Sequence, residues 1–345
     1  MKRLSIIVPI FNVEPYIERC IRSLEDQDIL KKDYEIICIN DGSPDNSREV
    51  VIMLQKEYDN IILIDQENQG VSVARNNGID IAQGSYLLMV DPDDYIKSAG
   101  FKQKLDILED TDIDVGITGF IILDETMHEE YRYDPEDGPV VALSGIEYSE
   151  ICEKGKYEIR DPHRSWAIFF NTNFLNSYNL RYLAGVPYLE DGEFIARVMC
   201  LAKKVCFLND LFYMRTTRHE SATHSNLYFS QKARNGFLRA AKNLLLFKNH
   251  QSVEEQRVFM NQFIIHFTIL ILTSLEPLNY FKTYSQLVNV LKKGPLKTLK
   301  FEGCCDFHKR MARNYNHSLN CFYLGWHFFK FRKSMKLKFK KIFSL

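Results

Sequence analysis

The sequence lacks most of the short patterns that assign a function at once. Its eight cysteines include no C-x-x-C pair, which argues against a zinc site or a dithiol redox centre. No run of 18 apolar residues occurs, and the nearest approach, residues 258–275, contains Asn261, Gln262 and His266. The formal net charge is −1, so we expect no nucleic-acid partner. These absences favour a globular, cytosolic protein with reduced thiols.

Glycine is absent where a phosphate-binding loop would need it. Residues 4–10 form an apolar run expected to be the first strand, and Phe11, Asn12, Val13 and Glu14 follow it. Nicotinamide-binding folds place G-x-G-x-x-G at this point, and P-loop enzymes place G-x-x-x-x-G-K-[ST] there. Neither class fits, so a phosphate group would have to be bound by some other device than a backbone cradle.

The first ninety residues alternate between strand and helix patterns. Apolar runs predict strands over residues 4–10, 36–39, 61–64 and 86–90. Helical spacing lies between them, with one helix expected to begin at Ser43 and Pro44 and another to cover 71–82. Strands that are buried on both faces and separated by helices indicate a mostly parallel sheet with right-handed crossovers. The expected fold class is therefore α/β.

The rest of the chain predicts a second, helical part. We expect strands at 114–123 and 205–213, and helical character over 169–178 and 192–202. The polar stretch 124–160 is expected to form loops or a small excursion over the site. Helical patterns dominate from residue 226 onward, with no long linker before them. The domains expected are an α/β domain over 1–225 and a helical C-terminal region over 226–345.

A cluster of aspartates follows the strand at 86–90. Asp91, Asp93 and Asp94 would repel one another unless a hard divalent cation such as Mg²⁺ or Mn²⁺ lay among them. The alternative is an ordinary polar turn. Ligands of parallel α/β sheets bind outside the carboxyl ends of the strands, and polar residues also follow two other predicted strands, at 9–12 and 40–43. This shared edge favours a functional site.

Several motifs follow one another along these strand ends: Val8-Pro9-Ile10-Phe11-Asn12, Asn40-Asp41-Gly42-Ser43, Asn68-Gln69-Gly70 with Ala74-Arg75-Asn76, Gly84, and Val90-Asp91-Pro92-Asp93-Asp94. Further matches are Trp166, Leu189-Glu190-Asp191-Gly192-Glu193-Phe194 and Tyr213-Met214-Arg215. The order resembles that of the family 2 glycosyltransferases, which have the GT-A fold. The resemblance covers roughly residues 1–225.

The resemblance implies metal-dependent, inverting transfer of a sugar from a nucleotide diphosphate to an acceptor hydroxyl. It assigns the general base to Asp191 and the metal, Mn²⁺ or Mg²⁺, to Asp93 and Asp91. The residues implied for the donor, expected to be a UDP-sugar, are Pro9, Phe11, Asn12, Asp41, Arg75, Asp91 and Arg215. Those implied to contact the acceptor or support these groups are Trp166, Glu190, Asp94, His219 and Ser221.

Several of these residues have a purely structural alternative. Asp191 can serve as a helix N-cap, Arg75 as a solvated helix charge, Asp41 as part of a turn and Trp166 as a core residue. The pKa of Asp191 is also open, because a helix N-terminus lowers the pKa of a carboxyl group and burial raises it. The sequence does not decide between these two effects.

The C-terminal tail is basic. No acidic residue follows Asp306, whereas ten lysines and arginines do, interleaved near the end with aromatic residues. This pattern suits the surface of an anionic membrane, with roughly 1 kcal/mol for each nearby cation. Docking on an acidic face of the protein itself is the alternative. We therefore expect an enzyme at the inner face of the cell membrane that acts on a glycan or lipid-linked glycan in bacterial surface polysaccharide synthesis.

Two other functions remain as alternatives. A non-catalytic subunit of glycan assembly could retain the same fold. A sugar nucleotidyltransferase would need a glycine-rich loop bearing a lysine after the first strand, and residues 11–14 do not provide one.

Overall fold

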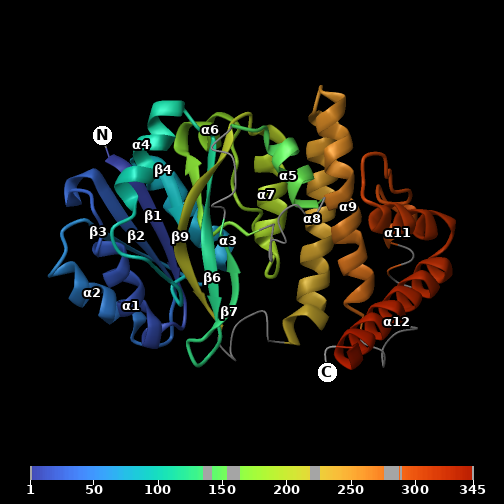
Figure 1. The fold of residues 1–345 in the computed structure, drawn as a ribbon, viewed down its shortest axis with the longest axis horizontal. Coiled ribbons are helices and arrows are strands. Elements are labelled where there is room, and N and C mark those ends of the chain that lie inside the picture. The colour runs from blue at the N-terminus through green and yellow to red at the C-terminus, as the bar shows by residue number, and fades with distance from the viewer. Residues whose placement is uncertain are drawn as a thin grey trace. The chain divides into compact units, whose positions relative to one another are not determined.

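The computed structural model describes residues 2–134, 142–153, 164–217, 226–275, 287 and 290–343. It divides into two compact units, Met1–Leu227 and Tyr228–Leu345 (Figure 1). The first, here called the sheet unit, holds a β-sheet with helices packed on it. The second, the helical unit, contains helices alone among its described residues.

The first half of the sheet is parallel. Its strands lie in the order β3-β2-β1-β4, and the helices α1, α2 and α3 connect them. Apolar side chains fill these strands, and every residue of β2 is buried, as expected for a strand covered on both faces. The elements are β1 (Lys2–Ile10), α1 (Glu14–Glu25), β2 (Tyr34–Asp41), α2 (Ser47–Gln55), β3 (Ile61–Gln66), α3 (Val71–Ile81) and β4 (Gly84–Met89).

The second half of the sheet is mixed. β8 pairs antiparallel with both β4 and β6, β6 runs parallel to β9, and β5 and β7 form antiparallel pairs at the margins. The expected parallel arrangement therefore describes the first four strands, and the later strands reverse direction. The remaining elements of this unit are β5 (Tyr95–Ile96), α4 (Phe101–Thr111), β6 (Val115–Leu123), β7 (Glu129–Tyr133), α5 (Gly145–Glu153), β8 (Ile168–Asn171), α6 (Thr172–Ser177), α7 (Glu190–Leu201) and β9 (Val205–Thr216).

Three local predictions are wrong. Residues 168–171 form β8, and α6 begins after them because the side chain of Asn171 caps that helix by accepting from Phe174 N at 3.0 Å. The stretch expected to be loops contains β7 and α5. The helix expected to start at Ser43 begins at Ser47, because the Ser43 hydroxyl instead binds Asn12 N and the Asp45 carboxylate.

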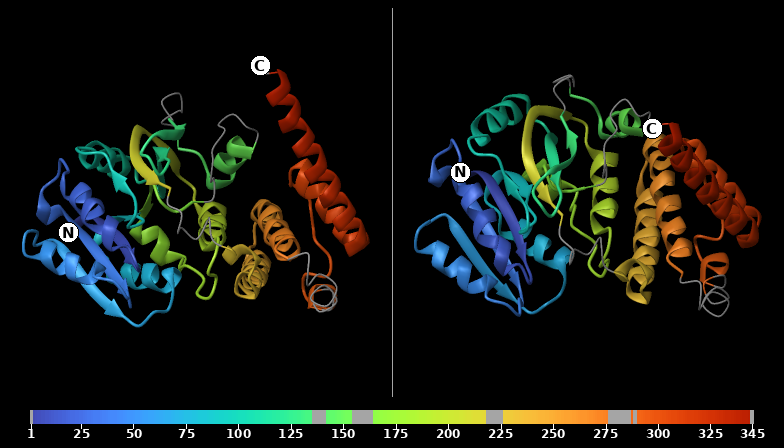
Figure 2. Two further views of the ribbon diagram at one scale, coloured as in Figure 1. Left: turned by 90° about the horizontal axis from the view of Figure 1, so that it is seen from below. Right: turned by 60° about the horizontal axis from the view of Figure 1, so that its bottom comes forward.

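The helical unit contains two long helices packed on each other and a C-terminal pair. α8 and α9 lie side by side in Figures 1 and 2, and α9 buries most of its surface. No helix within the described residues is long and apolar enough to span a membrane. The helices are α8 (Gln231–His250), α9 (Glu254–Thr273), α11 (Asp306–His317) and α12 (Leu319–Phe343).

Candidate active site

The carboxyl ends of β1, β2 and β4 meet at one edge of the sheet. The register pairs Ile10 with Asn40 and Ile7 with Met89, so the residues that follow these strands are neighbours in space. Ion pairs join the N-terminal turn of α7 to the same edge. Arg75 pairs with both Asp191 and Asp91, so its side chain lies between these two carboxylates. Side chains far apart in the sequence therefore converge on one acidic site.

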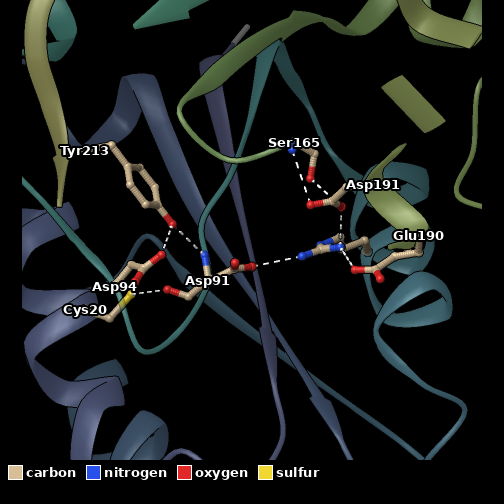
Figure 3. Close-up of polar contacts among 8 residues, drawn as sticks. Cys20, Asp91, Asp94, Ser165, Glu190, Asp191 and Tyr213 are labelled. Carbon is tan, nitrogen blue, oxygen red and sulfur yellow. Dashed lines mark hydrogen bonds and ion pairs between the residues drawn. The ribbon is translucent and has the colours of Figure 1, made fainter. Parts of the chain in front are cut away.

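Arg75, in the first half of α3, links the two sides of this site. One guanidinium nitrogen, Nη2, donates to Asp91 Oδ1 at 2.9 Å, while Nη1 donates to Glu190 Oε1 at 2.8 Å and to Asp191 Oδ1 at 2.9 Å. These contacts are drawn as dashed lines in Figure 3. The guanidinium also lies over the ring of Tyr182, 5.1 Å from its centroid. The prediction that Arg75 belongs to the site is consistent with this position, and a solvated helix charge is excluded because the residue is 3% exposed.

The surroundings of Arg75 stabilise its positive charge. Burial acts to lower the pKa of the guanidinium, but attraction from Asp191, Tyr182, Asp91 and Glu190 outweighs it and leaves the pKa well above its usual value. One cation thus faces three carboxylates, which leaves the site with a net negative charge while all three are ionised. This excess makes proton uptake by one of the carboxylates favourable.

Asp191 is the carboxylate that takes up this proton most readily. Burial, opposed by Arg75 and reinforced by Glu190 and Asp91, raises its pKa to about 7. Burial, which the sequence could not weigh, therefore outweighs the lowering effects of Arg75 and of the hydrogen bond from Ser165. The N-cap alternative is wrong, because the N-cap of α7 is Leu189 and the Asp191 side chain turns instead to Arg75 and Ser165.

The turn after β4 holds Asp94 and Asp91 in different ways. Asp94 is 2% exposed and accepts from Tyr213 Oη at 2.8 Å and Thr216 N at 2.7 Å, so its side chain fastens the turn to β9. Burial and the neighbouring charges of Asp93 and Asp91 raise its pKa well above the usual value. The Asp91 side chain is more open, at 30% exposed, and its main-chain N donates to Tyr213 Oη (Figure 3).

The residues present fit a divalent cation that is shared with a ligand. The described residues contain no group of three or more His, Cys, Asp or Glu side chains arranged to hold a metal ion. Mg²⁺ and similar ions are, however, commonly held by one or two carboxylates and complete their shell with substrate phosphates and water. Asp91 and Asp93 could supply such a pair. The donor set does not fit a metal cage made by the protein alone.

The residues expected to hold a nucleotide lie at the ends of β1 and β2. Phe11 is 46% exposed, whereas Pro9 is buried within β1. Asn12 adopts a left-handed conformation with φ 55°, and its N donates to Ser43 Oγ at 2.7 Å. The exposed ring of Phe11 therefore stands beside a firmly held backbone turn.

Asp41 is more enclosed than the sequence suggested. It is 3% exposed, and its carboxylate accepts from Gln66 Nε2 at 2.7 Å and from Gln69 N and Gly70 N at 2.8 Å each. A carboxylate offers about four lone-pair positions, so at most about one remains for a ligand. The carboxylate organises the turn that leads into α3 and Arg75.

Trp166 lies under the site, in the aromatic core. It is 5% exposed, its ring stacks on Tyr213 at 5.0 Å between centroids, and the edge of Phe120 contacts it at 4.9 Å. Arg215 lies over the same ring at 5.7 Å. The core alternative thus describes its position, and an acceptor role for Trp166 stays a prediction. His219 and Ser221 lie outside the described residues.

Two residues of the site were not predicted. Ser165 donates to Asp191 through both its hydroxyl and its main-chain N, and the ring of Tyr182 supports Arg75 while stacking on Phe194 at 4.1 Å. Ser165 directly precedes Trp166, which is a predicted site residue, and this adjacency was the available signal for Ser165. For Tyr182 the sequence offered none.

Comparison with known proteins identifies the family of the chain. The family described as Glycosyl transferase family 2 matches residues 5–179. The chain is 33% identical over 222 residues to the uncharacterized glycosyltransferase EpsJ of Bacillus subtilis, covering 64% of this chain and 62% of that protein. It is 26% identical over 313 residues to the poly(ribitol-phosphate) beta-glucosyltransferase of Bacillus spizizenii, covering 84% of this chain but 45% of that protein.

A solved structure shares the fold. Residues 1–349 of S. aureus TarS, crystallised in complex with UDP-GlcNAc, superpose with a TM-score of 0.63 at 19% sequence identity, covering 84% of this chain and 80% of that one. The α/β GT-A fold expected from the sequence is confirmed. With the family match spanning about half of its residues, the chain belongs to glycosyl transferase family 2.

Proposed function

We propose that this protein is an inverting glycosyltransferase that moves a sugar from a nucleotide diphosphate sugar to a hydroxyl of a growing glycan. The observation that carries the proposal is the placing of Asp191, with a pKa of about 7, across Arg75 from the aspartate turn at one strand edge. A UDP-sugar is the proposed donor, which is supported by the UDP-GlcNAc bound to the TarS structure. Synthesis of a bacterial surface polysaccharide is supported by the name of the Bacillus spizizenii relative.

The donor would occupy the ends of β1, β2 and β4. The exposed ring of Phe11 offers a face on which a pyrimidine base can stack, beside Pro9 and Asn12. Asp41 has about one lone pair left to accept a base N–H. Arg75 supports the donor side through its bond to Asp91. We assign Arg215, near the end of β9, to the diphosphate, and His219 and Ser221, which follow β9 in the sequence, to the acceptor side or to the support of these groups.

Asp93 and Asp91 would hold Mn²⁺ or Mg²⁺ together with the donor phosphates. When bound there, the cation would neutralise negative charge on the departing diphosphate. The protein's own contribution on this side is to fix the turn, because Asp94 is bonded to Tyr213 and Thr216 of β9.

Asp191 would act on the acceptor side. As the acceptor oxygen forms its bond to the anomeric carbon, the bond from that carbon to the diphosphate oxygen breaks on the opposite face. The proton of the acceptor hydroxyl passes to the Asp191 carboxylate. A general base is most effective when its pKa lies near the working pH, and about 7 meets that condition. Glu190, which shares Arg75 with it, would line the acceptor side.

A screen of nucleotide sugars tests the proposal. UDP-glucose, UDP-GlcNAc, UDP-galactose and GDP-mannose would be incubated with the protein and Mn²⁺, and release of the nucleotide diphosphate would be measured. We expect release from one UDP-sugar and its loss in Asp93→Ala. A non-catalytic assembly subunit would show no release with any donor, and an Asp93→Ala variant with unchanged function would support that alternative.

We also propose that the helical unit contacts an anionic membrane surface on which a lipid-linked acceptor is carried. Leu324, Phe328 and Phe331 follow one another at helical spacing on α12 and are 73%, 58% and 64% exposed. The tail that contains them carries ten cations and no acidic residue after Asp306. An apolar stripe amid cations suits anionic lipid. This arrangement would place the enzyme at the cytoplasmic face of the cell membrane.

Vesicle sedimentation tests this contact. We expect the protein to sediment with phosphatidylglycerol vesicles and much less with phosphatidylcholine vesicles. Exchange of Leu324 and Phe331 for serine should weaken sedimentation, whereas Leu246→Ser, which changes a 59% exposed leucine on α8, should not. Equal sedimentation with both kinds of vesicle, or equal loss in both variants, would contradict the proposal.

A further inference from the structure

The two oxygens of the Asp191 carboxylate are held unequally. Oδ1 accepts from Arg75 Nη1 at 2.9 Å and from Ser165 Oγ at 2.8 Å. Oδ2 accepts, among the described residues, from the main-chain N of Ser165 at 3.3 Å (Figure 3). Two short bonds to charged or hydroxyl donors are strong, and one at 3.3 Å is weak. Oδ2 is therefore the oxygen with lone pairs available for a proton.

Ser165 fixes this difference by contacting both oxygens. Its hydroxyl on Oδ1 and its main-chain N on Oδ2 oppose rotation of the carboxylate, which would otherwise exchange the two oxygens. Arg75 alone could not do so, because its Nη1 is shared between Asp191 and Glu190. The orientation of Asp191 consequently depends on where Ser165 is held.

Ser165 is itself anchored to the donor side of the sheet. It is 0% exposed, and Trp166, the next residue, forms a bridge to Met89 at the end of β4. The Trp166 ring stacks on Tyr213, whose hydroxyl accepts from Asp91 N and donates to Asp94. The backbone that positions the aspartate turn thus also positions Ser165, which donates the hydrogen bonds to Asp191.

We propose that Ser165 is a positioning residue that holds the Asp191 carboxylate so that Oδ2 receives the acceptor proton and Oδ1 stays engaged. The inference rests on the proposed function of Asp191 as general base and adds the residue that directs it. Ser165 touches neither the donor nor the acceptor in this role. Its hydroxyl stabilises the ionised carboxylate, so its removal favours the protonated form.

The charged groups around Asp191 define what a pH titration would report. Arg75 faces it from α3, Glu190 from the same turn of α7, Asp91 from the turn after β4, and the Tyr182 hydroxyl from the segment before α7. Ser165→Ala leaves all of these in place. Any change in the titration of Asp191 then reports the lost hydrogen bond.

The direct test is a carboxylate titration by NMR that needs no substrate. With aspartate labelled at its carboxylate carbon, the Asp191 signal is identified by its absence in Asp191→Asn. In the wild-type protein it should titrate near pH 7. Loss of a hydrogen bond to a charged group should move the midpoint upward by about one to two pH units in Ser165→Ala. An unchanged midpoint would overturn the proposal.

Matched variants separate the hydroxyl from general disturbance. Ser72, on α3, is 3% exposed and its hydroxyl has no hydrogen-bond partner within the described residues, so Ser72→Ala should leave the midpoint in place. A similar shift in Ser72→Ala would overturn the assignment. Ser165→Thr retains a hydroxyl and should titrate close to the wild type, and an alanine-like midpoint in a folded Ser165→Thr would also count against it.

A rate measurement distinguishes this inference from the proposed function. UDP release, with water as the acceptor and the UDP-sugar found active in the screen, should fall about tenfold at pH 7 in Ser165→Ala and recover at higher pH. If Asp191→Asn retains the wild-type rate, the proposed base is wrong. If Asp191→Asn is inactive while Ser165→Ala keeps the wild-type rate and pH profile, the base stands and the role of Ser165 falls.

Discussion

The acceptor side and the donor side of this site are completed to different degrees. Asp191 is 19% exposed at its side chain, has bonded partners on both oxygens and has a pKa of about 7. Asp91 is 30% exposed, and its turn offers two carboxylates, too few to complete a cation's shell. Arg75 bonds to both sides.

The difference indicates how the two sides would work. The fold itself sets the pKa of Asp191, the proposed base, because burial and neighbouring charges act on it before any substrate arrives. The cation site, in contrast, would be completed by the phosphates of the donor. Binding of donor and metal should therefore depend on each other, whereas titration of Asp191 should depend mainly on the protein.

Loss of the base should have the largest effect. Asp191→Asn keeps the shape of the side chain and removes its ability to take a proton, so UDP release should fall about 10³-fold, within the usual contribution of general base catalysis. UDP affinity, measured by calorimetry, should stay within a factor of three because the donor side is intact. A variant that retained a tenth of the wild-type rate would contradict the assignment of the base.

Loss of Arg75, which bonds to both sides of the site, should destabilise both of them. Arg75→Met leaves three carboxylates facing one another and should reduce the free energy of unfolding by roughly 3 kcal/mol, the lower end of the range for a broken buried ion pair because the carboxylates are partly exposed. Urea denaturation measures the change. Arg48→Met breaks an exposed pair with Asp65 and should lower the stability far less. Equal losses would show that Arg75 is not the central cation.

Much of the donor side could be predicted from local patterns. The apolar runs that became β1, β2 and β4 located the strand ends, and the rule for parallel sheets then placed Asp91 and Phe11 at one edge. The helical character predicted over 169–178 is wrong for its first residues, which belong to β8, since a short apolar run fits a buried strand and a buried helix equally well. A local pattern predicts a strand or a helix best where the pattern is long.

The acceptor side could be predicted only in part. Asp191 was identified through a motif, but its pKa depends on Arg75, which lies 116 residues away in the sequence, and on Ser165. Nothing in the sequence gives the packing of α7 against α3 that brings these groups together. Burial and long-range pairing are properties of the folded chain, which explains why a residue could be named and its protonation could not.

Because its pKa is raised, the ionised form of Asp191 should destabilise the folded protein. In the folded protein it binds its proton up to about pH 7, and in the unfolded chain only to about pH 4. The folded state therefore binds more protons between these values, so its stability falls as pH rises from about 4 to 7. Asp191→Asn removes this dependence and should therefore be more stable than the wild type at pH 8, but not at pH 4.

Thermal unfolding at the two pH values measures this effect. A control variant, Asp65→Asn, changes an exposed carboxylate whose pKa is lowered by Arg48 and Asn40, so it should lose stability at pH 8 instead of gaining it. If Asp191→Asn were no more stable than the wild type at pH 8, the pKa of the Asp191 carboxyl group would not be raised by folding.

The smallest effect concerns the incomplete cation site. If the donor phosphates complete the shell, Mn²⁺ should tighten UDP binding, and UDP should tighten Mn²⁺ binding by the same factor, because coupling between two ligands is reciprocal. We expect a factor of about ten, which corresponds to about 1.4 kcal/mol. Calorimetric titration of UDP with and without Mn²⁺ measures it, and Asp93→Asn should abolish the coupling while Asp191→Asn preserves it. Equal loss in both variants would mean that the two sides of the site are not separate. Asp191 would then also support the bound metal ion, and Arg75 would be the residue that joins the two sides.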